Sequence, residues 1–236
     1  MTDTRARKRH SLTTRLWHWL NAICLPILFM SGLNIFNAHP RLYWGHWGFD
    51  RADAWLVLRR FPGWMTIPDY YSLAAGRLWH FLFAWPFAFG LLAFMIISLV
   101  NRHFSRDIVT RRNDWRWSTI KADIARHLKL DFAEGASKFN FLQKLSYGVV
   151  IFILLPMMIF TGLAMSPAMD ANWPLIVDVL GGRQSARSIH FICAWALVAF
   201  FVIHIALVLL SGPLRQIRDM ITGGRVAPAS HGGPQA

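Results

Sequence analysis

Four long apolar stretches constrain the fold of this chain more than any other feature of its sequence. They cover residues 16–36, 78–100, 141–165 and 189–211, and Lys144 is the only charged residue within them. An α-helix needs roughly 20 residues to cross about 30 Å of hydrocarbon, and each stretch reaches that length. Because 55% of the residues are hydrophobic and only 16% are charged, the sequence predicts an all-α fold, a bundle of four transmembrane helices.

The charge distribution gives the topology of this bundle. A formal net charge of +13 at pH 7 is also typical of nucleic-acid-binding proteins. Here, however, most of the 25 Lys and Arg residues lie in the N-terminal tail, in the loop 101–140 and in the C-terminal tail. Positive charge of this kind stays in the cytoplasm. We therefore expect no nucleic-acid partner, and we predict a multi-pass membrane protein with both termini in the cytoplasm.

The chain divides into a membrane domain and two tails. We expect a basic cytoplasmic tail over residues 1–15, the four-helix domain over 16–211 and a cytoplasmic tail over 212–236. Because its last residues are rich in Gly, Pro, Ala and Ser, the C-terminal tail is predicted to be largely disordered. The outer loop 37–77 is rich in Trp, Gly and Pro and is a candidate docking surface.

The loop 101–140 contains an apolar stripe at helical spacing, with Lys and Arg on the other faces. The stripe consists of Trp117, Ile120, Ile124 and Leu128. This pattern is typical of an amphipathic helix that lies on the anionic surface of the inner leaflet. We therefore predict contact between this helix and membrane lipids.

An internal repeat relates the two halves of the domain. Leu25-Pro26 followed by Ser31-Gly32-Leu33 recurs as Leu155-Pro156 followed by Thr161-Gly162-Leu163. Each unit contains two spans, so both copies cross the membrane in the same direction. The two copies are 130 residues apart, so Gly148 occupies the position equivalent to His18. A glycine there would leave room for a large flat ligand.

Four histidines fall inside the apolar stretches, where an unpaired polar group is costly. They are His18, His80, His190 and His204. His190 and His204 share one side of the last helix and are separated by about 21 Å along its axis. From the directions of the helices, we expect His18 to pair with His204 near the cytoplasm. By the same argument, His80 should pair with His190 near the outside.

Two stacked histidine pairs in an apolar bundle are what two b-type haems require, and two axial ligands at each haem imply electron transfer. No Cys-x-x-Cys-His motif occurs for covalent attachment. A zinc site is disfavoured because zinc needs its ligands around one ion. Two other classes stay open: a haem-free membrane anchor, and a transporter that uses the histidines as polar pathway groups.

An arginine precedes three of the histidines by three residues, on the side of the nearer water layer. These arginines are Arg15, Arg77 and Arg187. One turn of helix from the ligand, each could pair with a haem propionate. The alternative is that they only extend toward the membrane surface from the ends of the spans.

The motifs Arg15-x-x-His18-Trp19 and Arg77-x-x-His80, and the segment 181–190 leading to His204, resemble the bacterial di-haem cytochrome b family. This cytochrome b561-like family includes cytochrome b subunits of thiosulfate reductase, nickel–iron hydrogenase and formate dehydrogenase. Within it, the chain most resembles the thiosulfate reductase cytochrome b subunit-like group. The likeness covers residues 11 to about 222.

The resemblance implies haem b at His18 and His204 toward the cytoplasm, and haem b at His80 and His190 toward the periplasm. It also implies an exchangeable quinone near the inner haem and an extracytoplasmic redox partner subunit, a molybdopterin oxidoreductase. The chain would then be an electron-transfer subunit of a membrane oxidoreductase in a bacterial inner membrane rather than a self-sufficient enzyme. Whether it forms a homodimer stays open.

Overall fold

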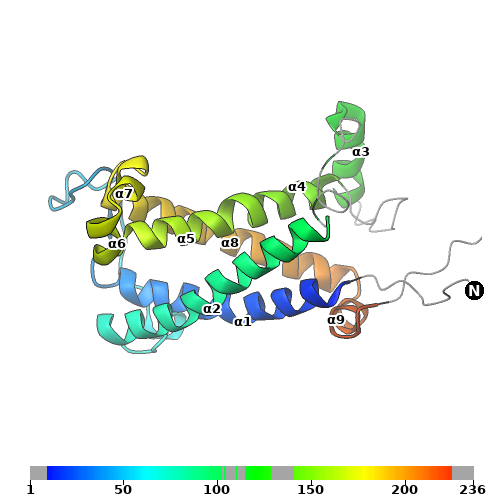
Figure 1. The fold of residues 1–236 in the computed structure, drawn as a ribbon, viewed down its shortest axis with the longest axis horizontal. Coiled ribbons are helices and arrows are strands. Elements are labelled where there is room, and N and C mark those ends of the chain that lie inside the picture. Colours follow the sequence, from blue (N-terminus) through cyan, green and yellow to red (C-terminus); the bar gives the residue numbers. More distant parts are fainter. Residues whose placement is uncertain (1–9, 103, 105–109, 111–114, 129–140, 225–236) are drawn as a thin grey trace, which may run out of the picture.

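The computed structural model describes residues 10–102, 104, 110, 115–128 and 141–224. Four long helical segments dominate it: α1 (Leu12–Phe36), α2 (Leu73–Val100), the segment formed by α4 (Phe141–Val149), η4 (Val150–Leu154) and α5 (Leu155–Ala164), and α8 (Arg183–Leu210). All four are long and apolar enough to cross a membrane. The prediction of an all-α transmembrane bundle is therefore confirmed (Figure 1).

Three of the helices begin earlier than predicted. Helices α1, α2 and α8 start at Leu12, Leu73 and Arg183, whereas the apolar stretches start at residues 16, 78 and 189. A search for uncharged residues ends an apolar stretch at the nearest arginine on its N-terminal side. The helix itself extends beyond that arginine to its N-cap. The Ser11 and Ser72 side chains accept hydrogen bonds from the backbone N–H groups of Thr14 and Ala75. The three arginines singled out above therefore lie within helices.

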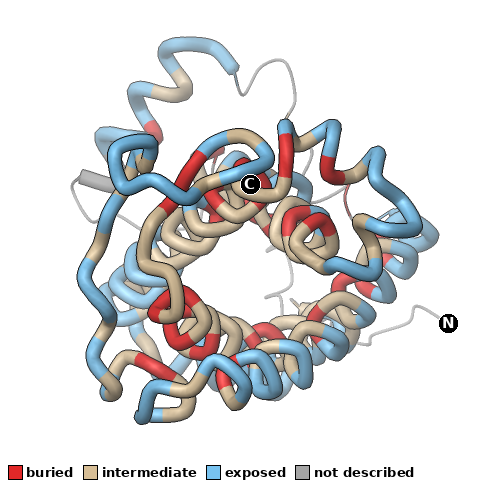
Figure 2. The backbone as a smooth tube through the Cα atoms, turned by 90° about the vertical axis from the view of Figure 1, so that its left-hand side faces the viewer, coloured by how far each residue is buried: buried red, intermediate tan, exposed pale blue. Residues whose placement is uncertain are grey.

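The helices pack as two pairs that correspond to the two halves of the repeat. Helix α1 packs along α2, and α5 packs along α8. Viewed along the bundle, the helices form a ring with exposed residues mainly on its outside (Figure 2). A buried cluster from both pairs joins the halves and contains Cys24, Phe87, Leu91, Val150 and Leu155. The segment η4 is π-helical and ends two residues before Pro156, which has no N–H to continue the α-helical pattern.

The start of α1 and the end of α8 lie at one end of the bundle, together with α3 (Trp117–Leu128) and α9 (Pro213–Thr222). Helix α3 is the amphipathic helix expected from the sequence, and Trp117 on its apolar stripe is exposed. Its location on the inner leaflet stays a prediction. The backbone N–H of His10 donates to the Gly223 carbonyl at 2.9 Å, so the first described residue contacts the C-cap of α9.

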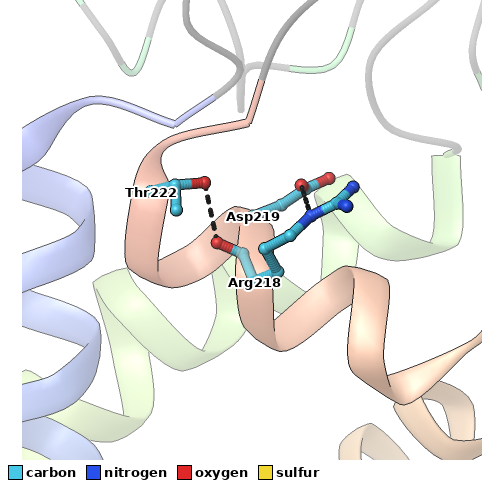
Figure 3. Close-up of polar contacts among 3 residues, drawn as sticks. All are labelled: Arg218, Asp219 and Thr222. Carbon is cyan, nitrogen blue, oxygen red and sulfur yellow. Dashed lines mark hydrogen bonds and ion pairs between the residues drawn. The ribbon is translucent and has the colours of Figure 1, made fainter.

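Helix α9 corrects the prediction that residues 212–236 are largely disordered. Gly212 has a φ of 93°, and Pro213 then starts a helix in which Arg218 and Asp219 form an ion pair at 3.7 Å (Figure 3). The Gly, Pro, Ala and Ser content on which that prediction rested belongs to residues 225–236, which lie outside the described part of the chain. The Arg15 Nε and Trp19 Nε1 groups of α1 donate to the Met220 carbonyl, which fixes α9 to the bundle.

The opposite end carries the outer loop. Strands β1 (Arg41–Leu42) and β2 (Leu56–Val57) form a short antiparallel pair. Three short helices complete this end: η1 (Gly63–Met65), α6 (Pro167–Asn172) and α7 (Leu175–Val179). The loop is anchored to the start of α8, because the Ser185 hydroxyl accepts from Gly45 N–H at 2.7 Å and the Ser188 hydroxyl donates to the Tyr43 carbonyl at 2.6 Å.

Candidate functional site

The four span histidines meet as two pairs. The ring centres of His18 on α1 and His204 on α8 are 6.3 Å apart, with their planes 60° from each other. The ring centres of His80 on α2 and His190 on α8 are also 6.3 Å apart, with an interplanar angle of 58°. Helix α8 therefore supplies one ring to each pair, while α1 and α2 supply the others. We call His18 and His204 the inner pair, and His80 and His190 the outer pair.

The separation within each pair fits two ligands of one metal ion. Two imidazoles on opposite sides of a metal have ring centres about 6 Å apart, since each nitrogen lies about 2 Å from the metal and about 1 Å from its ring centre. Both pairs match this value at 6.3 Å. Among the described residues, no group of three or more His, Cys, Asp or Glu side chains could hold a metal ion. Two ligands per site suit a cofactor that brings its own equatorial donors, as haem does.

The outer pair has a defined tautomer at His80. The Nδ1 atom of His80 lies 3.1 Å from the Leu28 carbonyl oxygen and 3.1 Å from the Ser31 hydroxyl. A carbonyl oxygen can only accept, so Nδ1 carries the proton and donates it. In a neutral imidazole this leaves Nε2 with a free lone pair, which is the state that binds a metal.

His190 has the equivalent contact in the other half of the repeat. Its Nδ1 lies 2.8 Å from the Thr161 hydroxyl, which itself donates to the Met157 carbonyl at 2.6 Å. Because the hydroxyl proton is used there, the Thr161 oxygen accepts from Nδ1. Ser31 and Thr161 are both fully buried and occupy the same position of the repeated motif. The repeated motif thus places a hydroxyl group beside the Nδ1 atom of each outer-pair histidine.

The glycines that follow in the motif lie against the same rings. A Cβ added at Gly32 would be 3.5 Å from Cε1 of His80, and one added at Gly162 would be 3.8 Å from Cε1 of His190. These are ordinary van der Waals distances, so the backbone of each glycine lies close to the ring on the neighbouring helix. The serine or threonine and the glycine together hold each outer ring from one side.

The inner pair is supported differently. Nδ1 of His18 is buried and has no hydrogen-bond partner among the described residues, and the ring of His204 stacks on Phe200 at 5.8 Å. Two more buried atoms on the same stretch of α1 are also without a partner in the described structure, Nε1 of Trp17 and Oδ1 of Asn21. A Cβ added at Gly148 would meet nothing within 4 Å, so the position opposite His18 in the repeat is open.

The three arginines near the histidines have different partners. Arg15 donates to the Met220 carbonyl at 3.2 Å, and Arg77 lies over the Phe81 ring at 5.6 Å. Arg187 donates to the carbonyls of Arg41 and His39 in the outer loop. These contacts use only part of each guanidinium, which has five N–H donors.

The sequence analysis did not assign a role to Ser31 or Thr161. The signal was present, because a hydroxyl residue stands directly before a glycine at the same place in both halves. Only the folded helices show that this place lies beside the Nδ1 atom of a histidine on the next span.

Comparisons with known proteins give one matching family and several relatives. A family model described as prokaryotic cytochrome b561 matches residues 9–223. A relative from Azospira oryzae, named as the protein-methionine-sulfoxide reductase subunit YedZ1, is 29% identical over 203 residues, covering 85% of this chain and 90% of the relative. A relative from Cupriavidus necator, named as a Ni/Fe-hydrogenase B-type cytochrome subunit, is 24% identical over 210 residues, covering 81% and 74%. No solved structure matches the chain.

Proposed function

The chain belongs to the prokaryotic cytochrome b561 family and is a membrane b-type cytochrome, and on this premise we propose that it holds two haem b groups for electron transfer across the membrane. The electrons would pass between the quinone pool and an extracytoplasmic oxidoreductase. The observation that carries the proposal is the meeting of four span histidines in two pairs with the same ring separation, 6.3 Å.

His18 and His204 would hold one haem, and His80 and His190 the other. Haem b, when bound, would supply one-electron redox chemistry at these two sites. The chain's own contribution is orientation. The Leu28 carbonyl and the hydroxyls of Ser31 and Thr161 hold the Nδ1 protons of the outer histidines, which directs both Nε2 lone pairs to the metal. The apolar helices around them exclude water.

The role of Thr161 gives a testable prediction. Thr161→Val keeps the shape of the side chain but removes the acceptor at 2.8 Å from Nδ1 of His190. Loss of such a support typically weakens metal binding roughly 10- to 100-fold. We expect the outer haem to dissociate faster by about that factor, and the electron paramagnetic resonance signal of that haem to change as its ligand ring reorients.

Thr222→Val is the matched control for this substitution. It removes a hydroxyl that, like that of Thr161, donates to the carbonyl four residues earlier, but from α9 at the other end of the bundle. The control should keep the wild-type haem dissociation rate and spectrum. An outer haem that is equally stable in Thr161→Val and in the wild type would contradict the support role.

We place the quinone near the inner pair. Three buried polar atoms without a described partner lie on one stretch of α1, at Trp17, His18 and Asn21. Buried polar groups are normally hydrogen-bonded. Quinone carbonyl oxygens can accept from a Trp or His N–H, and the Asn21 oxygen could accept only from a hydroxyl of the quinol form. These atoms therefore support a quinone site at the end of the bundle where α1 begins.

The partner would dock at the other end. Several large aromatic side chains of the outer loop are exposed there, and these form what we call the outer aromatic surface: Trp44, Trp47, Phe49 and Trp64. Aromatic residues of this kind are enriched at protein interfaces. The named relatives are subunits of a reductase and of hydrogenases, which supports a redox partner. A molybdopterin oxidoreductase outside the inner membrane is the partner we propose, with both termini of this chain in the cytoplasm.

Reduction by a quinol tests this function. The purified holoprotein in liposomes is mixed with a lipid-soluble quinol, and the reduced cytochrome spectrum is followed. We expect His190→Ala, which keeps the inner pair, to be reduced by the quinol. We expect His204→Ala to be reduced by dithionite only. Quinol reduction of His204→Ala at the wild-type rate would contradict a quinone site at the inner pair.

A further inference from the structure

A second polar cluster lies where the outer loop meets the start of α8. The Tyr43 side chain is 1% exposed, and its hydroxyl has no hydrogen-bond partner in the described part of the structure. Nε2 of His39 is buried and equally without a partner there. The two rings stack with their centres 5.8 Å apart. A buried polar group without a hydrogen-bond partner costs free energy. The Tyr43 hydroxyl and the His39 Nε2 atom therefore point to a ligand that both would bind.

A cation stands beside these two groups. The Arg187 guanidinium donates to the backbone carbonyls of His39 and Arg41, and it interacts electrostatically with Tyr43 and His39. Within the described chain, no carboxylate lies at ion-pair distance from Arg187. Two carbonyls occupy two of its five N–H donors and do not neutralise its charge. The cluster therefore offers a positive charge and hydrogen-bond donors without a matching anion.

The place of the cluster is fixed by the chain on both sides. Arg187 precedes His190 by one turn of α8. The Ser188 hydroxyl donates to the Tyr43 carbonyl at 2.6 Å, which holds the loop residue over the same turn. The cluster thus lies one helical turn beyond the outer histidine pair, toward the loop end of the bundle.

The chemistry selects a carboxylate. Burial and the positive charges of Arg187 and Arg41 lower the pKa of His39 below its usual value. At pH 7 the His39 ring is therefore neutral and can donate one hydrogen bond. An arginine, a tyrosine hydroxyl and a neutral imidazole together match the oxygens of one carboxylate, and pairing a charged group with such donors gives the stronger class of hydrogen bond.

We propose that Tyr43, His39 and Arg187 form a carboxylate site that binds a propionate of the haem held by His80 and His190. This inference rests on the proposed function, because it needs a haem at the outer pair. It adds two residues of the outer loop to the arginine of α8, and it makes the outer loop a part of the haem site. The same three side chains could also bind a free carboxylate from solution. The test distinguishes a haem propionate from a free carboxylate.

The test uses the full-length holoprotein produced with haem that carries carbon-13 at its propionate carboxyl groups. Infrared difference spectra between the oxidised and reduced states are recorded at the potential where the outer haem titrates. Tyr43→Phe removes only the buried hydroxyl. Tyr71→Phe removes the hydroxyl of an exposed tyrosine in the same loop and is the matched control.

We expect a carboxylate band that responds to the isotope label to shift in Tyr43→Phe and to stay unchanged in Tyr71→Phe. The outer haem should also dissociate roughly tenfold faster in Tyr43→Phe, the effect of one lost charge-assisted hydrogen bond. Identical labelled bands in Tyr43→Phe and the wild type would overturn the inference. A shifted band that does not respond to the label would assign the site to a free carboxylate and would also overturn it. If the wild type lacks the spectrum of an outer haem, the proposed function itself fails.

Discussion

His190→Ala is expected to lower the haem content of the purified protein from two to one per chain. The ring of His190 is 6.3 Å from that of His80, and alanine leaves one ligand where low-spin binding needs two. Electron transfer across the membrane should stop, because only the haem at the inner pair remains. Haem is counted by the pyridine haemochrome method, and transfer is followed as quinol-driven reduction of an acceptor on the other side of the liposome.

Double variants make this prediction sharper. His80→Ala should cause the same loss as His190→Ala, and the two together should remove no more than either alone. Combining His190→Ala with His18→Ala should remove both haems. His46→Ala, an exposed histidine of the outer loop, is the control and should keep two. Loss of both haems in His80→Ala/His190→Ala, with a normally folded protein, would contradict the assignment of the pairs.

Gly182→Ala is expected to lower the stability of the folded protein strongly, because it combines an unfavourable backbone conformation with a steric clash. Gly182 has φ 109° and ψ 165°, a conformation that is essentially restricted to glycine and costs other residues about 1–3 kcal/mol. An added Cβ would also lie 2.5 Å from the carbonyl carbon and oxygen of Gly45 and 2.6 Å from the backbone nitrogen of His46. Both contacts are with backbone, so the outer loop must move away from α8.

The expected cost is at least about 2 kcal/mol, which corresponds to a decrease of roughly 4–8 °C in the thermal unfolding midpoint of a protein of this size. Circular dichroism of the purified holoprotein measures it. Gly212→Ala is the matched control, because Gly212 also has a positive φ, 93°, but an added Cβ would meet nothing within 4 Å. It should cost clearly less. Equal midpoints for the two variants would show that the contact between Gly182 and Gly45 does not hold the loop.

Hydropathy and helix direction predicted most of the bundle. Four apolar stretches gave the four spans, and the positions of His18 and His80 at the starts of helices that run in opposite directions gave their partners on α8. This worked because a transmembrane helix fixes the depth of each residue from its position in the chain. The structure brings the expected rings together.

Other features depend on contacts that no pattern in the sequence gives. The starts of α1, α2 and α8 were placed too late, since charged residues at the membrane surface end an apolar window but not a helix. Helix α9 was missed because the composition of the last residues dominated the tail. The outer loop has no periodicity, so its attachment to Ser185 and Ser188 could be found only in three dimensions.

The two halves of the repeat now differ in a defined way. Both halves support an outer histidine through a hydroxyl, Ser31 or Thr161. Only the first half has a histidine near the N-terminal end of its leading helix, since Gly148 stands opposite His18. The inner pair therefore depends on α8 for its second ring, and the open position at Gly148 is the counterpart of that difference.

The haem content of the purified protein tests the central claim most directly. Pyridine haemochrome quantification against protein concentration, with an oxidised-minus-reduced absorbance spectrum, gives the type and number of haems per chain. The four histidines in two pairs predict a b-type spectrum and two haems per chain. One haem per chain would contradict the two-site assignment. A colourless protein after expression with ample haem would contradict the cytochrome assignment and favour a membrane anchor or a transporter.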